Sequence, residues 1–100
     1  MRRGSTPTNT FSLDIDLRQA TVFVSYEQNG RLVFEKTGED LTVEEDEISL
    51  KLTQEDTLLL KPGEVLIQIR YIFPTGDADA SNIIRTTAER VIKDGVISCV

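Results

Sequence analysis

Apolar and polar side chains alternate along most of this chain, in short runs separated by turn residues. The clearest run is Glu64–Phe73, where the apolar side chains occupy every second position: Val65, Ile67, Ile69, Tyr71 and Phe73. Gln68 and Arg70 point to the opposite side. A period of two, with β-branched and aromatic residues on one face, is typical of a half-buried antiparallel strand. Glu64–Phe73 is therefore predicted to be a strand with one face in the core.

The first third of the chain repeats this alternation. It predicts strands at Thr10–Asp16, Thr21–Gln28 and Arg31–Lys36. Their inward side chains are expected to be Phe11, Leu13 and Ile15, then Val22, Val24 and Tyr26, then Leu32 and Phe34. Asn29-Gly30 separates the second and third strands, and this pair strongly favours a type I′ hairpin turn, which needs positive φ at both central residues.

The middle of the chain is predicted to hold a turn at Thr37–Asp40, a short strand at Leu41–Val43, and a further strand. The inward side chains of that further strand are Ile48, Leu50 and Leu52. Thr53 followed by Asp56 resembles a capping box with Asp in place of the usual Glu. We therefore expect one helical turn at Gln54–Leu59, closing an end of the core with Leu58 and Leu59.

After a turn at Pro74–Asp77, the segment Ala80–Lys93 fits two structures. Its apolar positions have the spacing of an amphipathic helix: Ile83, Ile84, Thr87, Ala88, Val91 and Ile92. The adjacent Thr86-Thr87 and the other β-branched residues favour a strand. A sheet made of short hairpins also needs a closing strand, so we predict a long final strand and keep the helix as the alternative.

One hundred residues are enough for one domain. Residues 1–8 lack periodicity and are predicted to be a flexible lead-in, residues 9–97 a single domain, and residues 98–100 a tail. About six or seven short strands joined by turns make an all-β sandwich the first choice of fold.

The composition limits the partners. Eleven basic and 17 acidic residues give a net charge of −6, which disfavours nucleic acid as a partner. No apolar run exceeds three residues, as in Leu58–Leu60, so no membrane-spanning helix is expected. Met1–Gly4 is basic like the start of a signal peptide, but the polar Ser5–Thr8 follows it, and secretion by that route is not expected.

Catalytic signatures are absent from the sequence. With no histidine, Ser-His-Asp and Cys-His arrangements are excluded, and the glycines form no phosphate-binding loop. The single cysteine, Cys99, excludes an intrachain disulfide and a multi-cysteine metal site. Asp14 and Asp16 share one face of a predicted strand, but glycoside hydrolysis needs carboxylates on opposite sides of a bond in a cleft. We interpret them as acids that keep an edge strand soluble.

Two acidic segments are candidates for cation binding. Asp77–Ser81 copies the first five positions of a calcium loop, but Asn82 stands where glycine is needed and Ala88 where a bidentate glutamate is needed. A turn explains the same residues. The run Glu44–Glu47 could bind a cation or a basic partner, and is interpreted as a solvated loop. We therefore expect no catalytic, cofactor-binding or metal-binding residues.

Several stretches resemble a protein family. They are Thr6–Leu13, Val24–Gly30, Glu35–Thr37, Leu52–Leu58 and Lys93–Ile97. Together they resemble a family of small proteins, of about 100 residues, from phages and prophages of Gram-positive gut bacteria. The chain is more distantly similar to the immunoglobulin-like N-terminal domain of phage baseplate upper proteins. The resemblance implies an immunoglobulin-like sandwich and a phage setting, in the virion or the bacterial cytoplasm, and carries over no catalytic residue.

Two functions follow as hypotheses. The first is a non-enzymatic phage or prophage structural or assembly module, such as a baseplate or tail accessory, that binds a phage protein or a second copy of itself. It would dock through a strand edge, with Phe11–Asp16 and Ile83–Ile92 as the expected edges. The second is an acidic host-directed protein made by a prophage, which binds a basic partner more weakly as salt rises.

Overall fold

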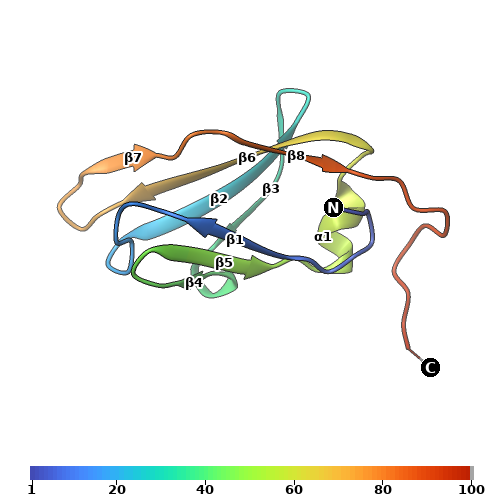
Figure 1. Cartoon of the computed structure of the whole chain (residues 1–100), viewed down its shortest axis with the longest axis horizontal. Coiled ribbons are helices and arrows are strands. Elements are labelled where there is room, and N and C mark those ends of the chain that lie inside the picture. The colour runs from blue at the N-terminus through green and yellow to red at the C-terminus, as the bar shows by residue number, and fades with distance from the viewer. Residues whose placement is uncertain (100) are drawn as a thin grey trace.

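The alternating segments become strands of two antiparallel sheets (Figure 1). The computed structural model describes residues 1–99. Its strands are β1 (Thr8–Ser12), β2 (Thr21–Gln28), β3 (Arg31–Thr37), β4 (Thr42–Val43), β5 (Glu47–Lys51), β6 (Gly63–Ile72), β7 (Ala78–Ala80) and β8 (Ile84–Ala88). The helical elements are α1 (Gln54–Leu59) and the short 3₁₀ turn η1 (Gly38–Asp40).

The strand order is that of an immunoglobulin sandwich. One sheet has the order β1-β5-β4, and the other β3-β2-β6, with β7 and β8 pairing with different halves of β6. Immunoglobulin domains place strands B, E and D in one sheet and C, F and G in the other, which variable-type domains extend with C′. With β1 as B, the chain gives B-E-D and C′-C-F-G. The predicted all-β, immunoglobulin-like sandwich is confirmed.

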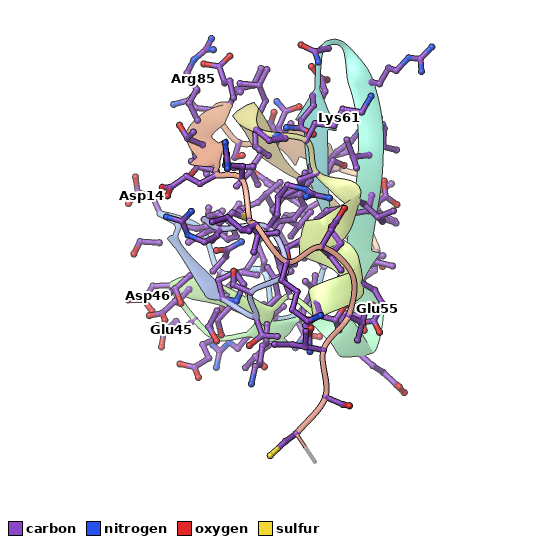
Figure 2. The ribbon with its side chains drawn as sticks, turned by 90° about the vertical axis from the view of Figure 1, so that its right-hand side faces the viewer. Asp14, Glu45, Asp46, Glu55, Lys61 and Arg85 are labelled. Carbon is purple, nitrogen blue, oxygen red and sulfur yellow. The ribbon has the colours of Figure 1, made fainter. Side chains whose placement is uncertain are left out.

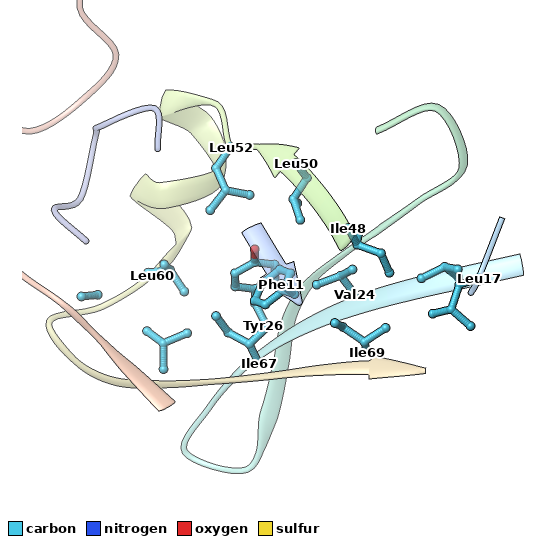
Figure 3. Close-up of a cluster of buried hydrophobic side chains, with 13 residues drawn as sticks. Phe11, Leu17, Val24, Tyr26, Ile48, Leu50, Leu52, Leu60, Ile67 and Ile69 are labelled. Atoms are coloured by element: carbon cyan, nitrogen blue, oxygen red, sulfur yellow. The ribbon is translucent and has the colours of Figure 1, made fainter. Parts of the chain in front are cut away.

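The core lies between the two sheets and is filled from both (Figure 3). Its buried side chains are Phe11, Leu17, Val22, Val24, Tyr26, Ile48, Leu50, Leu52, Leu60, Val65, Ile67, Ile69 and Ala88. Antibody domains add an inter-sheet disulfide and a buried tryptophan. This chain has one cysteine and no tryptophan, so packing, hydrogen bonds and an ion pair hold its sheets together without a disulfide.

The β2–β3 hairpin has the expected turn and an unexpected bulge. Asn29 and Gly30 have φ of 52° and 76°, as a type I′ turn requires. The register then shifts, so that Leu32 lies opposite Glu27 and Phe34 lies opposite Tyr26. The bulge brings Phe34 onto the core side, where its ring stacks on Tyr26 at 4.5 Å. Leu32 was wrongly predicted to face the core, and 60% of it is exposed.

The first strand ends earlier than the predicted Thr10–Asp16. The Asp16 carboxylate accepts a hydrogen bond from the Arg18 backbone N–H at 3.0 Å, which makes an Asx turn after β1. This turn carries Leu17 into the core, and Ile15, predicted to face inward, is exposed. The alternation in the sequence continued past the point where a local side-chain hydrogen bond bends the backbone.

The helical turn α1 begins as predicted. Thr53 and Asp56 form a complete capping box, with each side chain bonded to the backbone N–H of the other at 3.1 and 2.9 Å. The prediction that Leu59 helps to close the core is wrong, because Leu59 is exposed and Leu60 is fully buried. Leu60 has extended backbone angles, so the chain turns at this residue and directs its side chain inward.

The segment Ala80–Lys93 contains the strand β8, and the helical alternative is wrong. The predicted single strand over Ala80–Lys93 is also corrected, because β8 ends at Ala88 and three residues, 81–83, interrupt it before Ile84. Hydrogen bonds that involve side chains join the interrupted segment to β6. Ser81 Oγ accepts a hydrogen bond from Ile69 N at 3.0 Å, and Gln68 Nε2 donates to the Ser81 carbonyl at 2.9 Å.

The residues before β1, predicted to be a flexible lead-in, are hydrogen-bonded to the sandwich. The Met1 nitrogen donates to the Thr87 carbonyl at 2.6 Å, Glu89 N donates to the Met1 carbonyl, and Arg3 N donates to the Glu89 carbonyl. Arg2 and Glu89 form a parallel bridge. Met1–Arg3 therefore lies along the far end of β8 like a short added strand, and we call it the N-terminal strap.

Candidate functional site

Two strand edges lie on one side of the sandwich and border a groove of about 470 Å³. Figure 2 shows Asp14, next to β1, and Arg85, on β8, at this same side. We call this side the open side, and the groove is lined by Thr10, Phe11, Ser12, Leu13, Asp14, Ser81, Asn82 and Ile84. The two edges predicted from sequence as docking edges thus lie next to each other.

The edge of β1 that faces away from β5 has unpaired backbone groups. The Pro7 carbonyl accepts from Leu52 N, and Leu13 N donates to the Asp46 carbonyl, so the odd-numbered residues of this segment bond to β5. Because antiparallel pairing alternates, the N–H and C=O groups of Thr8, Thr10 and Ser12 point outward. This edge presents the pattern that an added strand recognises.

Each of the other described edge strands has a feature that hinders strand addition. β4 has only two residues, and β3 has a bulge together with Arg31, Glu35 and Lys36. Bulges, charges and shortness are the usual ways in which proteins protect an edge. β1 has none of them, because Thr8–Ser12 contains neither a charged residue nor a proline.

The β7–β8 edge is protected in two places. The N-terminal strap occupies the outward groups of Thr87 and Glu89, so the far end of the predicted docking edge Ile83–Ile92 is already covered. The interruption at Ser81 breaks the edge in its middle. Arg85, which pairs with Glu64 at 3.0 Å, adds a charge to the remaining part.

A second surface lies on the outer face of the five-stranded sheet. It contains a hollow of about 400 Å³ bordered by Phe23, Arg70 and Ile72, and a smaller one beside Leu32 and Ile83. Polar side chains, among them those of Ser25 and Gln68, separate these apolar residues. Scattered apolar side chains of this kind are normal on a protein surface, so the open side is the stronger candidate.

No family model matches this chain, and no curated protein matches it. Among solved structures, the V domain of amphioxus IgVJ-C2 is similar, with 14% identity and a TM-score of 0.38, over 91% of this chain and 97% of that one. A similarity this weak does not establish a common fold, so the fold is assigned from the strand order described above.

The acids singled out from the sequence do not form a catalytic pair. Asp14 and Asp16 follow β1 in a loop, not on a strand as predicted, and both are exposed. The Arg18 side chain, 2.7 Å from Asp16, lowers the pKa of that carboxyl to about 2. Leu13 N bonds to Asp46 O, so this loop lies beside the run Glu44–Glu47 and forms one acidic end with it (Figure 2).

The calcium-loop residues also do not converge. The Asp77 carboxylate accepts a hydrogen bond from the Thr75 hydroxyl at 3.1 Å, and the Asp79 carboxylate accepts one from the N–H of Ala80. The Ser81 hydroxyl accepts one from the N–H of Ile69 on β6. Over residues 1–99, no three side chains of His, Cys, Asp or Glu are grouped so that they could hold a metal ion. Cys99 is free and exposed, and no helix in that range is long and apolar enough to cross a membrane.

One buried polar cluster joins the sheets, and its role is structural. Lys36 Nζ lies 2.9 Å from an Asp56 carboxylate oxygen, and Asn9 Nδ2 donates to the Tyr26 hydroxyl at 2.7 Å. Burial is the main cause that raises the pKa of Tyr26 to about 12. Burial also opposes ionisation of Asp56, but hydrogen bonds from Thr53 and Lys36 outweigh it and lower the Asp56 pKa. Both groups therefore keep their ordinary protonation states at neutral pH.

The groove itself was missed by sequence reasoning. Its far wall consists of Ser81, Asn82 and Ile84, all of which the sequence pattern places in one continuous strand, Ala80–Lys93. A weak signal was present, because Ser81 and Asn82, two residue types common in turns, directly precede the β-branched Ile83 and Ile84. The docking of the N-terminal strap on β8 has no counterpart in the local sequence pattern.

Proposed function

We propose that this chain is a non-enzymatic protein-binding module that assembles by accepting a partner's strand at the open side. The observation that supports it is the free edge of β1, uncharged and next to a groove of about 470 Å³. Main-chain hydrogen bonds from an added strand would supply affinity, and side chains entering the groove would supply selectivity.

The biological setting belongs to the proposal. The sequence stretches named above resemble small phage and prophage proteins, and we propose a role as a structural or assembly component, such as a baseplate or tail accessory. A small acidic sandwich with one accessible edge suits such a role, because strand addition joins subunits without a large apolar interface.

The proposal is tested with the substitution Thr10→Pro in phage particles. The Thr10 N–H points outward, so proline removes no internal hydrogen bond but blocks pairing with an added strand. We expect mass spectrometry to find the unaltered chain in purified particles at a stoichiometric level, and the Thr10→Pro chain only in the soluble lysate. Thr10→Val, which keeps the N–H, is the matched control. Equal incorporation of the proline variant would contradict the proposal.

The acidic end supports a second candidate function. Asp14, Glu44, Glu45 and Asp46 are exposed around one pair of loops, and a host-directed binder with this surface would select a basic partner. Binding of such a partner should weaken steeply between about 0.05 and 0.5 M salt, since exposed charges are screened. Glu45→Gln with Asp46→Asn should reduce both the affinity and its dependence on salt, and unchanged binding would exclude this candidate.

A further inference from the structure

The segment after β8 exposes large apolar side chains away from the sandwich. Ile92 is 90% exposed, Val96 56% and Ile97 55%, and Figure 1 shows the segment leaving both sheets. It belongs to no strand or helix between Val91 and Cys99. Single exposed apolar residues are ordinary, but three large β-branched ones within six positions match the composition of a strand.

Few contacts hold this segment to its own sandwich. The Gln54 amide pairs with the backbone of Ile97 at 3.0 and 2.9 Å, and Asp94 lies 3.4 Å from Arg3. Both contacts are at the end of the molecule that holds α1 and the strap. The segment therefore lies away from the groove of its own copy, whose β1 wall runs from Thr10 to Asp14.

The free edge of β1 complements this segment. Thr8, Thr10 and Ser12 present outward backbone groups, and Leu13 and Ile84 give the groove apolar walls. β1 carries no charge, and the segment carries one Lys and one Asp, which cancel. Asp14 is the one charged residue that lines the groove, so little of the net charge of −6 on each chain lies at this contact.

We propose that residues 91–99 of one copy add as a strand to β1 of a second copy, in the groove of the open side. This inference rests on the proposed function and names its partner as a second copy. Donor segment and acceptor edge are different surfaces, so the contact is head-to-tail and produces chains or rings of copies. Because successive side chains of a strand point to opposite faces, either Val96 or Ile97 enters the groove and is removed from water there.

Cys99 provides the test, because it lies within the donor segment. Two acceptor variants, Thr10→Cys and Ser12→Cys, each also carry Cys99→Ser, and each is mixed with the unaltered chain under mild oxidation. Paired strands bring facing Cα atoms within about 5.5 Å, close enough for a disulfide. We expect a disulfide-linked heterodimer with at least one acceptor variant, at ten times or more the yield of a Glu35→Cys, Cys99→Ser control on the β3 edge.

A donor chain with Val96→Asp and Ile97→Asp should lose the cross-link while remaining folded by circular dichroism. Equal cross-linking of the β3 control would overturn the inference, as would acceptor chains that link to each other through Thr10→Cys, which would indicate pairing of β1 with β1. Sedimentation of the unaltered chain should show association as concentration rises to about 1 mM. A strictly monomeric chain would overturn this inference, while incorporation into particles would still support the proposed function.

Discussion

At the residue scale, the ion pair of Lys36 and Asp56 joins the two sheets. Both side chains are mostly buried, and Asp56 also accepts the Thr53 N–H at 2.9 Å. The pair therefore links β3 of one sheet to the capping box that follows β5 of the other. The two cap residues were predicted from their spacing, but their partner was not, because Lys36 is distant in sequence and reads as a surface residue.

Lys36→Met should lower the free energy of unfolding by about 2 kcal/mol at pH 7, since a mostly buried carboxylate loses a charged hydrogen-bond donor. The Asp56 pKa is lowered in the folded state. Its contribution is thus complete above the ordinary aspartate pKa of about 4 and is lost as the pH falls through the folded-state pKa. Urea unfolding should show a steeper acid loss for the unaltered chain than for Lys36→Met. Lys51→Met, on the exposed side of β5, is the control, and equal effects would contradict the account.

At the element scale, the short-range features were predictable and the breaks in strands were not. The Asn29-Gly30 turn, the capping box and the alternation in β6 depend on residues close in sequence. The bulge in β3 and the interruption before β8 depend on pairing with another strand, so the sequence pattern does not report them. The two predicted edge strands do lie at sheet edges, but β1 begins and ends earlier than the predicted Thr10–Asp16, and β8 is shorter than the predicted Ile83–Ile92.

Gln28 connects two elements that are distant in sequence. Its buried amide donates to the Lys61 carbonyl at 2.7 Å and accepts from Lys61 N at 2.8 Å, which ties the end of β2 to the start of β6. Gln28→Ala should cost about 2–3 kcal/mol, because both backbone groups of Lys61 lose their partner. Thermal and urea unfolding measure this loss. Gln19→Ala, in an exposed loop, should change stability by less than about 0.5 kcal/mol, and a comparable loss there would refute the assignment.

At the scale of the whole molecule, the sandwich has one side where strand pairing is unfinished. β3 is bulged and charged, β4 is very short, and the strap covers the far end of β8. β1 alone among the described edge strands lacks such protection. Sequence alone pointed to β1 and the last strand as edges, but only their spatial arrangement reveals that they share a groove and that one of them is partly covered.

Residue-resolved amide hydrogen exchange tests this account most directly. In the dilute monomer, the outward amides of Thr10 and Ser12 should exchange rapidly, while Leu13, whose N–H bonds to the Asp46 carbonyl, exchanges slowly. In the assembled state, whether with a second copy or within a particle component, Thr10 and Ser12 should become protected by at least about tenfold and Leu13 should not change. Thr10 and Ser12 amides that exchange equally fast in both states would show that the β1 edge is not where this protein binds.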